Sequence, residues 1–134
     1  MATNLDLRAI PVKIKFDKGK TLNPTFFYLS PSFTVIDLTG YTARMQVRLA
    51  YSDVSPLFDL TTANGGLVLV VGTATLDNGT QVPNAHGVKF VLTSAQTTTI
   101  GFSEAIFDIE LIKPGGDVLP FIKGTLTPFE EVTK

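Results

Sequence analysis

Residues 36–50 read IDLTGYTARMQVRLA and combine a turn signal with a regular strand pattern. The Asp-Leu-Thr-Gly part has the polar and glycine residues typical of turns. From Thr42 to Leu49, Ala, Met, Val and Leu occupy every second position, and Thr, Arg, Gln and Arg lie between them. This alternation predicts a β-strand with one buried and one exposed face.

The period of two recurs along the chain. Val12, Ile14 and Phe16 alternate with charged residues, and residues 104–111 alternate except at Ile106. Other segments are rich in the β-branched and aromatic residues that favour strands. They are residues 25–29, 67–71, 87–92, 118–122 and 125–129.

Roughly seven to nine short strands separated by turn signals predict an all-β fold, an antiparallel β-sandwich that is Ig-like or jelly-roll-like. At most one short helix is expected, over residues 92–97, where Thr93 and Gln96 have the spacing of a capping box. We expect an N-terminal arm at residues 1–9 and a single sandwich domain at residues 10–134.

Composition limits the function. The net charge of the 134 residues is −1, with no basic cluster, so we expect no nucleic-acid partner. The longest apolar run, residues 67–71, is too short to cross a membrane, and no secretory signal is visible, so we expect a soluble protein without a membrane partner. Cysteine is absent, which excludes thiolate zinc sites, and we expect no metal and no cofactor.

Two sets of residues have the chemistry of a catalytic site, and each has a simpler interpretation. His86, the only histidine, can act as a general base or be a polar loop residue before a strand. Asp108 and Glu110 share one face of a predicted strand, as paired glycosidase carboxylates can. The simpler account is cross-strand pairing with Arg44 and Arg48. We therefore expect no catalytic residues and no enzyme.

Asp77-Asn78-Gly79 offers oxygen ligands of the kind that calcium prefers. Gln81 and Val82 follow where an EF-hand loop requires further acidic residues. A tight hairpin turn is the favoured interpretation, because Asn-Gly supplies the positive φ angles that such turns need.

Aromatic residues leave two interpretations open. Exposed tyrosines among Tyr28, Tyr41 and Tyr51 would suit stacking on a sugar. The run Phe26-Phe27-Tyr28 places rings on both faces of one strand, which indicates either two-sided burial or a patch covered by a partner. Further candidates for such a patch, or for the core, are Phe33, Phe102 and Phe129.

The segment DLTGYTARMQVR, residues 37–48, resembles a motif of small virion proteins of tailed bacteriophages. Later segments match the same family in order, over most of the chain. They are LTTANGG (60–66), TSAQT (93–97), FDIEL (107–111), GTLTP (124–128) and EVT (131–133). The chain departs from the family in its N-terminal arm and in a longer segment at residues 77–86. The resemblance implies a non-enzymatic sandwich similar to the N-terminal domain of baseplate upper proteins.

The function expected from the sequence is that of a structural subunit of a tailed phage particle, made in the host bacterial cytoplasm and located in the virion. It would be a tail or baseplate subunit or a capsid cement or decoration protein. Its expected partners are other virion proteins, either of the tail or baseplate or the major capsid protein, and further copies in a homo-oligomer. The alternative is a carbohydrate-binding module for a host surface glycan.

Three segments are predicted to make the protein contacts: the arm, residues 23–29, and a long loop at residues 77–86. The candidate contact residues in and beside them are Met1, Leu5, Leu7, Phe26, Phe27, Tyr28, Asn78 and His86.

Overall fold

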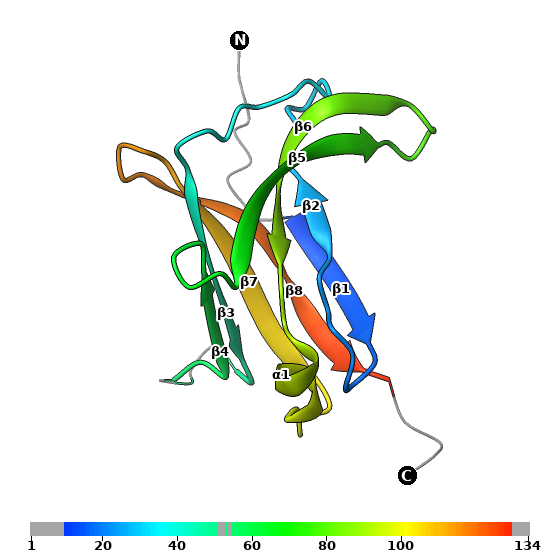
Figure 1. Cartoon of the computed structure of the whole chain (residues 1–134), viewed down its shortest axis with the longest axis vertical. Helices are drawn as coiled ribbons and strands as arrows, with labels where there is room; N and C mark the ends of the chain where they lie inside the picture. Colours follow the sequence, from blue (N-terminus) through cyan, green and yellow to red (C-terminus); the bar gives the residue numbers. More distant parts are fainter. Residues whose placement is uncertain (1–9, 51–52, 54, 130–134) are drawn as a thin grey trace.

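The computed structural model of the chain describes residues 10–50, 53 and 55–129. In this part of the chain, eight strands form two facing sheets and one short helix lies at an end of the sandwich (Figure 1), so the predicted all-β sandwich is confirmed. The elements are β1 (Ile10–Phe16), β2 (Thr25–Phe27), β3 (Thr42–Arg48), β4 (Phe58–Thr61), β5 (Leu67–Thr75), β6 (Gln81–Phe90), α1 (Ser94–Thr98), β7 (Ala105–Ile112) and β8 (Val118–Pro128).

The larger sheet has five strands in the order β1-β8-β7-β3-β4. In β3, Ala43, Met45 and Val47 are buried, whereas Thr42 and Arg44 are exposed. β7 pairs antiparallel with β3 and repeats this alternation. Because side chains of a strand alternate between faces, this pattern determines which face of the sheet turns toward the core.

One pair in this sheet departs from the expected antiparallel arrangement. β1 runs parallel to β8, with Val12 opposite Gly124. The two strands are far apart in the sequence, so no tight turn imposes an antiparallel register on them. A Cβ atom at Gly124 would lie 1.9 Å from the Val12 carbonyl oxygen. The close approach of β1 to β8 therefore requires glycine at this position.

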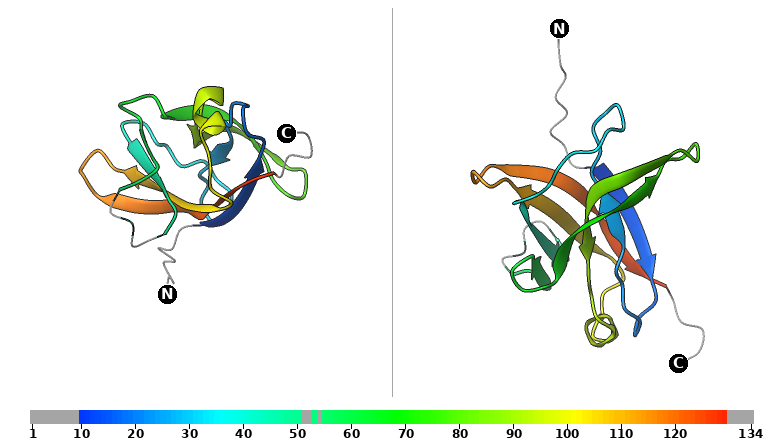
Figure 2. Two further views of the ribbon diagram at one scale, coloured as in Figure 1. Left: turned by 90° about the horizontal axis from the view of Figure 1, so that it is seen from below. Right: turned by 45° about the horizontal axis from the view of Figure 1, so that its top comes forward.

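The smaller sheet has three strands in the order β2-β6-β5. The hairpin β5–β6 closes in the tight turn predicted from Asp77-Asn78-Gly79, with Gly79 at φ +87° and Asn78 Oδ1 accepting a hydrogen bond from the Thr80 amide at 2.9 Å. Near its tip β6 carries one extra residue, and Asn84 there has φ +58°. Such a β-bulge bends the hairpin, whose tip curves away from the rest of the sheet (Figure 2).

The structure corrects several predicted boundaries. Residues 77–86 are not a long loop, because β6 begins at Gln81 directly after the hairpin turn. The segments predicted at 118–122 and 125–129 form one strand, β8, which continues through Gly124 beside β1 and ends at Pro128. β4 was not predicted: it is four residues long and shows only two apolar–polar repeats.

The helix α1 confirms the predicted capping box. The Thr93 hydroxyl accepts a hydrogen bond from the Gln96 amide, and the Gln96 side chain accepts one from the Thr93 amide. Buried Thr97 ties the helix to the β1–β2 connection, since its hydroxyl accepts from the Gly19 amide at 3.0 Å and donates to the Lys20 carbonyl at 2.8 Å. No helix in the described residues has the length and apolar character needed to cross a membrane.

The turn before β3 explains the DLTG stretch. Asp37 Oδ1 accepts hydrogen bonds from the Thr39 amide and hydroxyl, at 2.8 and 2.6 Å, and these bonds lower the pKa of Asp37. Gly40 has φ +83°, which closes the turn, and Leu38 is buried between the sheets. His86 Nδ1 accepts a hydrogen bond from the Leu38 amide at 3.3 Å. His86 is thus a half-buried strand residue that holds this turn, and its prediction as a loop residue is wrong.

Candidate functional site

A groove of about 550 Å³ lies on the side of the sandwich where β1 and β2 are the edge strands of their sheets. On the other side, β4 runs directly into β5 through a turn at residues 62–66. Most of the groove lining is apolar and comes from β1, β2, β8, the tip of β5–β6 and the loop after β2. The lining residues are Val12, Thr25, Phe26, Phe27, Leu29, Phe33, Ala74, Thr75, Leu76, Asp77, Asn78 and Ile122.

Two adjacent phenylalanines of β2 reach the groove from opposite faces of the strand. Phe26 turns inward, and its ring stacks on the core ring of Phe90 with centroids 6.2 Å apart. Phe27 lies over two glycines of the neighbouring strands. A Cβ atom would lie 3.0 Å from the Phe27 ring at Gly87 and 3.4 Å from it at Gly72. The missing side chains at these two positions make room for the Phe27 ring.

Phe33 is exceptional in both backbone and exposure. Its φ of +62° lies in the left-handed region, and its side chain is 58% exposed. That conformation costs a non-glycine residue about 1–2 kcal/mol, whereas glycine adopts it freely. An exposed ring on a strained backbone adds little to the core. Strain of this kind is typical of functional positions.

The open edge of β2 presents backbone groups to the groove side. The Tyr28 amide donates to the His86 carbonyl at 2.9 Å, and the Phe90 amide donates to the Pro24 carbonyl at 3.3 Å. Because antiparallel strands alternate between bonded and non-bonded pairs, the backbone groups of Thr25 and Phe27 point away from β6. An extended chain is the natural partner of such an edge.

The groove has little that could perform chemistry. Among the described residues that line it, Asp77 alone is charged, and the Asn78 side chain is engaged in the hairpin turn. Within residues 10–50, 53 and 55–129, no three His, Asp or Glu side chains lie close enough to hold a metal ion. Apolar surface, aromatic rings and a free strand edge suit binding of a polypeptide.

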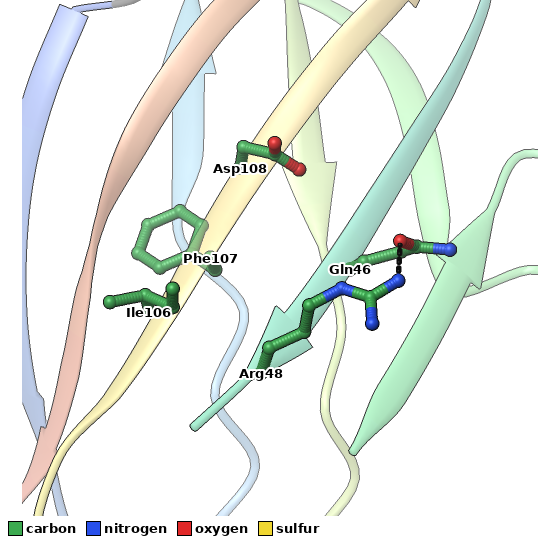
Figure 3. Close-up of a pocket in the computed structure, with 5 residues that line it drawn as sticks. All are labelled: Gln46, Arg48, Ile106, Phe107 and Asp108. Atoms are coloured by element: carbon green, nitrogen blue, oxygen red, sulfur yellow. Dashed lines mark hydrogen bonds between the residues drawn. The ribbon is translucent and has the colours of Figure 1, made fainter. Parts of the chain in front are cut away.

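The candidate catalytic carboxylates, Asp108 and Glu110, lie elsewhere, on the outer face of the five-stranded sheet. Arg44 Nε donates to Glu110 Oε1 at 2.6 Å, so the predicted cross-strand pairing is confirmed for these two residues. Arg48 does not pair with Asp108: it donates to Gln46 Oε1 at 2.7 Å and to the Asp53 carbonyl. Figure 3 shows Asp108 on the neighbouring strand, beside a shallow depression of about 220 Å³.

Partial burial raises the pKa of Asp108, and the negative charge of Glu110 raises it further. The positive charges of Arg44, Arg48 and Lys123 oppose this rise. The raised pKa of Asp108 thus comes first from its partial burial and then from Glu110 on the same strand, while the cations of the neighbouring strands oppose it. Of the two carboxylates, Glu110 is engaged by Arg44, as the simpler interpretation of this pair predicted.

The tyrosines give little support to a sugar-stacking platform. Tyr28 is half-buried and its ring stacks on Phe121 with centroids 5.2 Å apart. Tyr41 is also half-buried and packs against the core. Tyr51 lies outside the described residues.

The structure brings three of the predicted contact residues together: Phe26, Phe27 and Asn78 line the groove. Tyr28 and His86 lie outside the groove lining: both are half-buried, Tyr28 against Phe121 and His86 against the turn at Leu38. The predicted contacts Met1, Leu5 and Leu7 lie outside the described residues.

Other groove residues were not recognised from the sequence. Val12, Leu76 and Ile122 lie on three separate strands or turns, and each resembles an ordinary core position in its local pattern. Phe33 was noted only as one of several phenylalanines, since its strained backbone has no sequence signal. Phe102 packs against the core, and Phe129 is exposed at the end of β8, outside the groove. Comparisons with protein-family models and with curated protein sequences find no match for this chain.

Proposed function

We propose that the protein is a non-enzymatic structural subunit of a tailed phage particle, and that it assembles by protein–protein contacts through the groove between β1 and β2. The observation that carries the proposal is the exposed, strained Phe33 on an apolar groove at two strand edges. The left-handed Phe33 closes a tight turn between Ser30 and Thr34, but glycine would suit that backbone better, and the turn does not require an exposed aromatic ring. A protein partner would cover the apolar lining and pair with the open edge.

The shape of the groove favours a polypeptide over a small molecule. Pockets for small ligands are enclosed and place a few polar groups around the ligand. Here the lining is apolar, with aromatic side chains from Phe26, Phe27 and Phe33. Aromatic residues are enriched at the centres of protein interfaces, where their burial contributes most of the binding energy.

The resemblance of residues 37–48 and of the later segments to small phage virion proteins gives the proposed setting. It favours a tail or baseplate location, and a capsid cement or decoration protein is the second candidate. Quantitative mass spectrometry of purified particles distinguishes the two locations. A copy number on the order of hundreds per particle indicates the capsid, and one on the order of a dozen indicates the tail. The number of copies follows the symmetry of the part of the particle to which the protein is bound.

A paired substitution tests the role of the groove. Phe33→Asp places a charge on the groove, and Val118→Asp places one on an exposed apolar residue of β8 on the far face of the larger sheet. We expect particles to lose the Phe33→Asp chain and to retain the Val118→Asp chain, with both variants folded by circular dichroism. Absence of the wild-type chain from purified particles would contradict the proposal, as would equal incorporation of the two variants.

A further inference from the structure

We propose that the groove between β1 and β2 takes the N-terminal segment, residues 1–9, of a second copy of this chain, bound as an added extended strand. This inference rests on the proposed function, because it names the partner that the groove would bind during assembly.

The receiving side is a strand edge with an apolar floor. Thr25 and Phe27 direct backbone groups away from β6, and Phe26 and Leu29 supply apolar surface beside them. From the facing sheet, Val12 lines the same groove. A strand added to β2 would therefore form backbone hydrogen bonds and also cover apolar side chains, which are the two components of β-strand addition.

The sequence of residues 1–9, MATNLDLRA, matches these needs. Leu5, Leu7 and Ala9 alternate with polar residues, so an extended segment would present one apolar and one polar face. Arg8 carries the charge opposite to that of Asp77, which is the charged residue of the groove lining. The chemistry of the segment is thus complementary to the groove in both apolar surface and charge.

The alternation changes phase where the segment joins β1. In β1 the inward positions are the even-numbered Val12, Ile14 and Phe16, whereas the apolar residues of the segment have odd numbers. If the segment simply prolonged β1, Leu5 and Leu7 would point to the outer face of the sheet. The apolar side chains of the segment therefore need a surface other than the inner face of the larger sheet, to which β1 contributes.

The residues next to β1 also disfavour folding the segment back into its own groove. β1 begins at Ile10, close to Val12 on the groove wall, so an immediate reversal would be required. Residues 8–11 are Arg-Ala-Ile-Pro, without the Gly, Asn or Asp of tight turns. Pro11 also biases Ile10 toward an extended backbone. A segment of nine residues can span about 30 Å, which is enough to reach a neighbouring molecule.

The absence of cysteine allows a clean cross-linking test with the full chain. Leu7→Cys chains are mixed with Thr25→Cys chains, whose new thiol lies on the groove edge, and oxidised. The matched control mixes Leu7→Cys with Thr42→Cys, because Thr42 is also an exposed strand threonine but lies on the larger sheet. A disulfide requires the two Cα atoms to lie within about 7 Å. We expect several-fold more mixed dimer with Thr25→Cys than with Thr42→Cys.

Equal yields from the two mixtures would overturn the inference. So would the double variant Leu7→Cys/Thr25→Cys if it closed a disulfide within one chain at low protein concentration, since the segment would then occupy its own groove. Selective cross-linking should also disappear when Leu5→Asp is added, and its persistence would count against the apolar match. If cross-linking fails but Phe33→Asp still prevents incorporation into particles, the second-copy inference falls and the proposed function stands.

Discussion

The outer face of the five-stranded sheet and the groove between β1 and β2 differ in how completely the chain pairs or covers the groups that it presents there. On the outer face, Arg44 pairs with Glu110, and Arg48 is held by Gln46 and the Asp53 carbonyl. In the groove, the edge of β2 and the exposed ring of Phe33 face outward, and Phe33 holds a strained backbone. This difference supports our proposal that the protein makes its contacts through the groove and not through the outer face.

The largest expected effect comes from removing one wall of the groove. Gly124→Val places a side chain where the Val12 carbonyl lies, so β1 must leave β8. We expect a loss of about 3 kcal/mol or more in the free energy of unfolding, measured by urea denaturation. Gly115→Ala is the control, since a Cβ there meets no atom within 4 Å. A Gly124→Val chain as stable as the control would contradict the parallel β1–β8 pairing.

Phe33→Gly separates stability from assembly. Glycine removes the strain of the left-handed backbone, so the free energy of unfolding should rise by about 1 kcal/mol. Incorporation into particles should fall, because the exposed ring is lost from the groove. Thermal unfolding and particle composition measure the two effects. A variant that is less stable, or that assembles as well as the wild type, would show that Phe33 serves the fold.

On the outer face, breaking the ion pair should have a small effect. Arg44→Gln removes the partner of Glu110, but both side chains are partly exposed, so the loss should be about 0.5 kcal/mol or less. Urea denaturation at low and high salt measures it, and the difference from wild type should shrink as salt rises. A loss as large as that of Gly124→Val would mean that this face is more than a solvated surface.

The smallest effect concerns pH. Burial and Glu110 raise the folded-state pKa of Asp108 above its ordinary value, so the folded state binds this proton more tightly than the unfolded state. The stability contributed by Asp108 therefore increases as pH falls through its folded pKa. Asp108→Asn should be slightly more stable than wild type at neutral pH, and this advantage should disappear in acid. Denaturation curves of both proteins across the acid range test this prediction. A stability advantage of Asp108→Asn that grew in acid would contradict the raised pKa of Asp108.

The sequence predicted those parts of the fold that rest on local patterns. β3 and β7 have one wet and one buried face, so their alternation identified them, and Asn78-Gly79 identified the hairpin turn. β4 is too short to show a period, and the β1–β8 pair depends on strands far apart in the chain. The pairing of distant strands depends on the tertiary structure and cannot be read from a short stretch of sequence.

The candidate site was predictable only in part, for the same reason. The run Phe26-Phe27-Tyr28 indicated rings on both faces of one strand, and two of these rings do line the groove. The opposite wall comes from Val12 and Ile122, which the two sheets bring there only after folding. His86 was misread because the DLTG turn that it holds is distant in sequence.

The central claim, that the groove is the contact surface and the outer face is not, has one direct test. Phe33→Cys and Thr42→Cys place single thiols in a chain without cysteine, one on the groove and one on the outer face. Their labelling rates are compared in the free protein and in assembled particles. We expect both thiols to react in the free protein and only that of Phe33→Cys to be protected in the particle. Equal reactivity of Phe33→Cys in both states, or protection of Thr42→Cys alone, would contradict the claim.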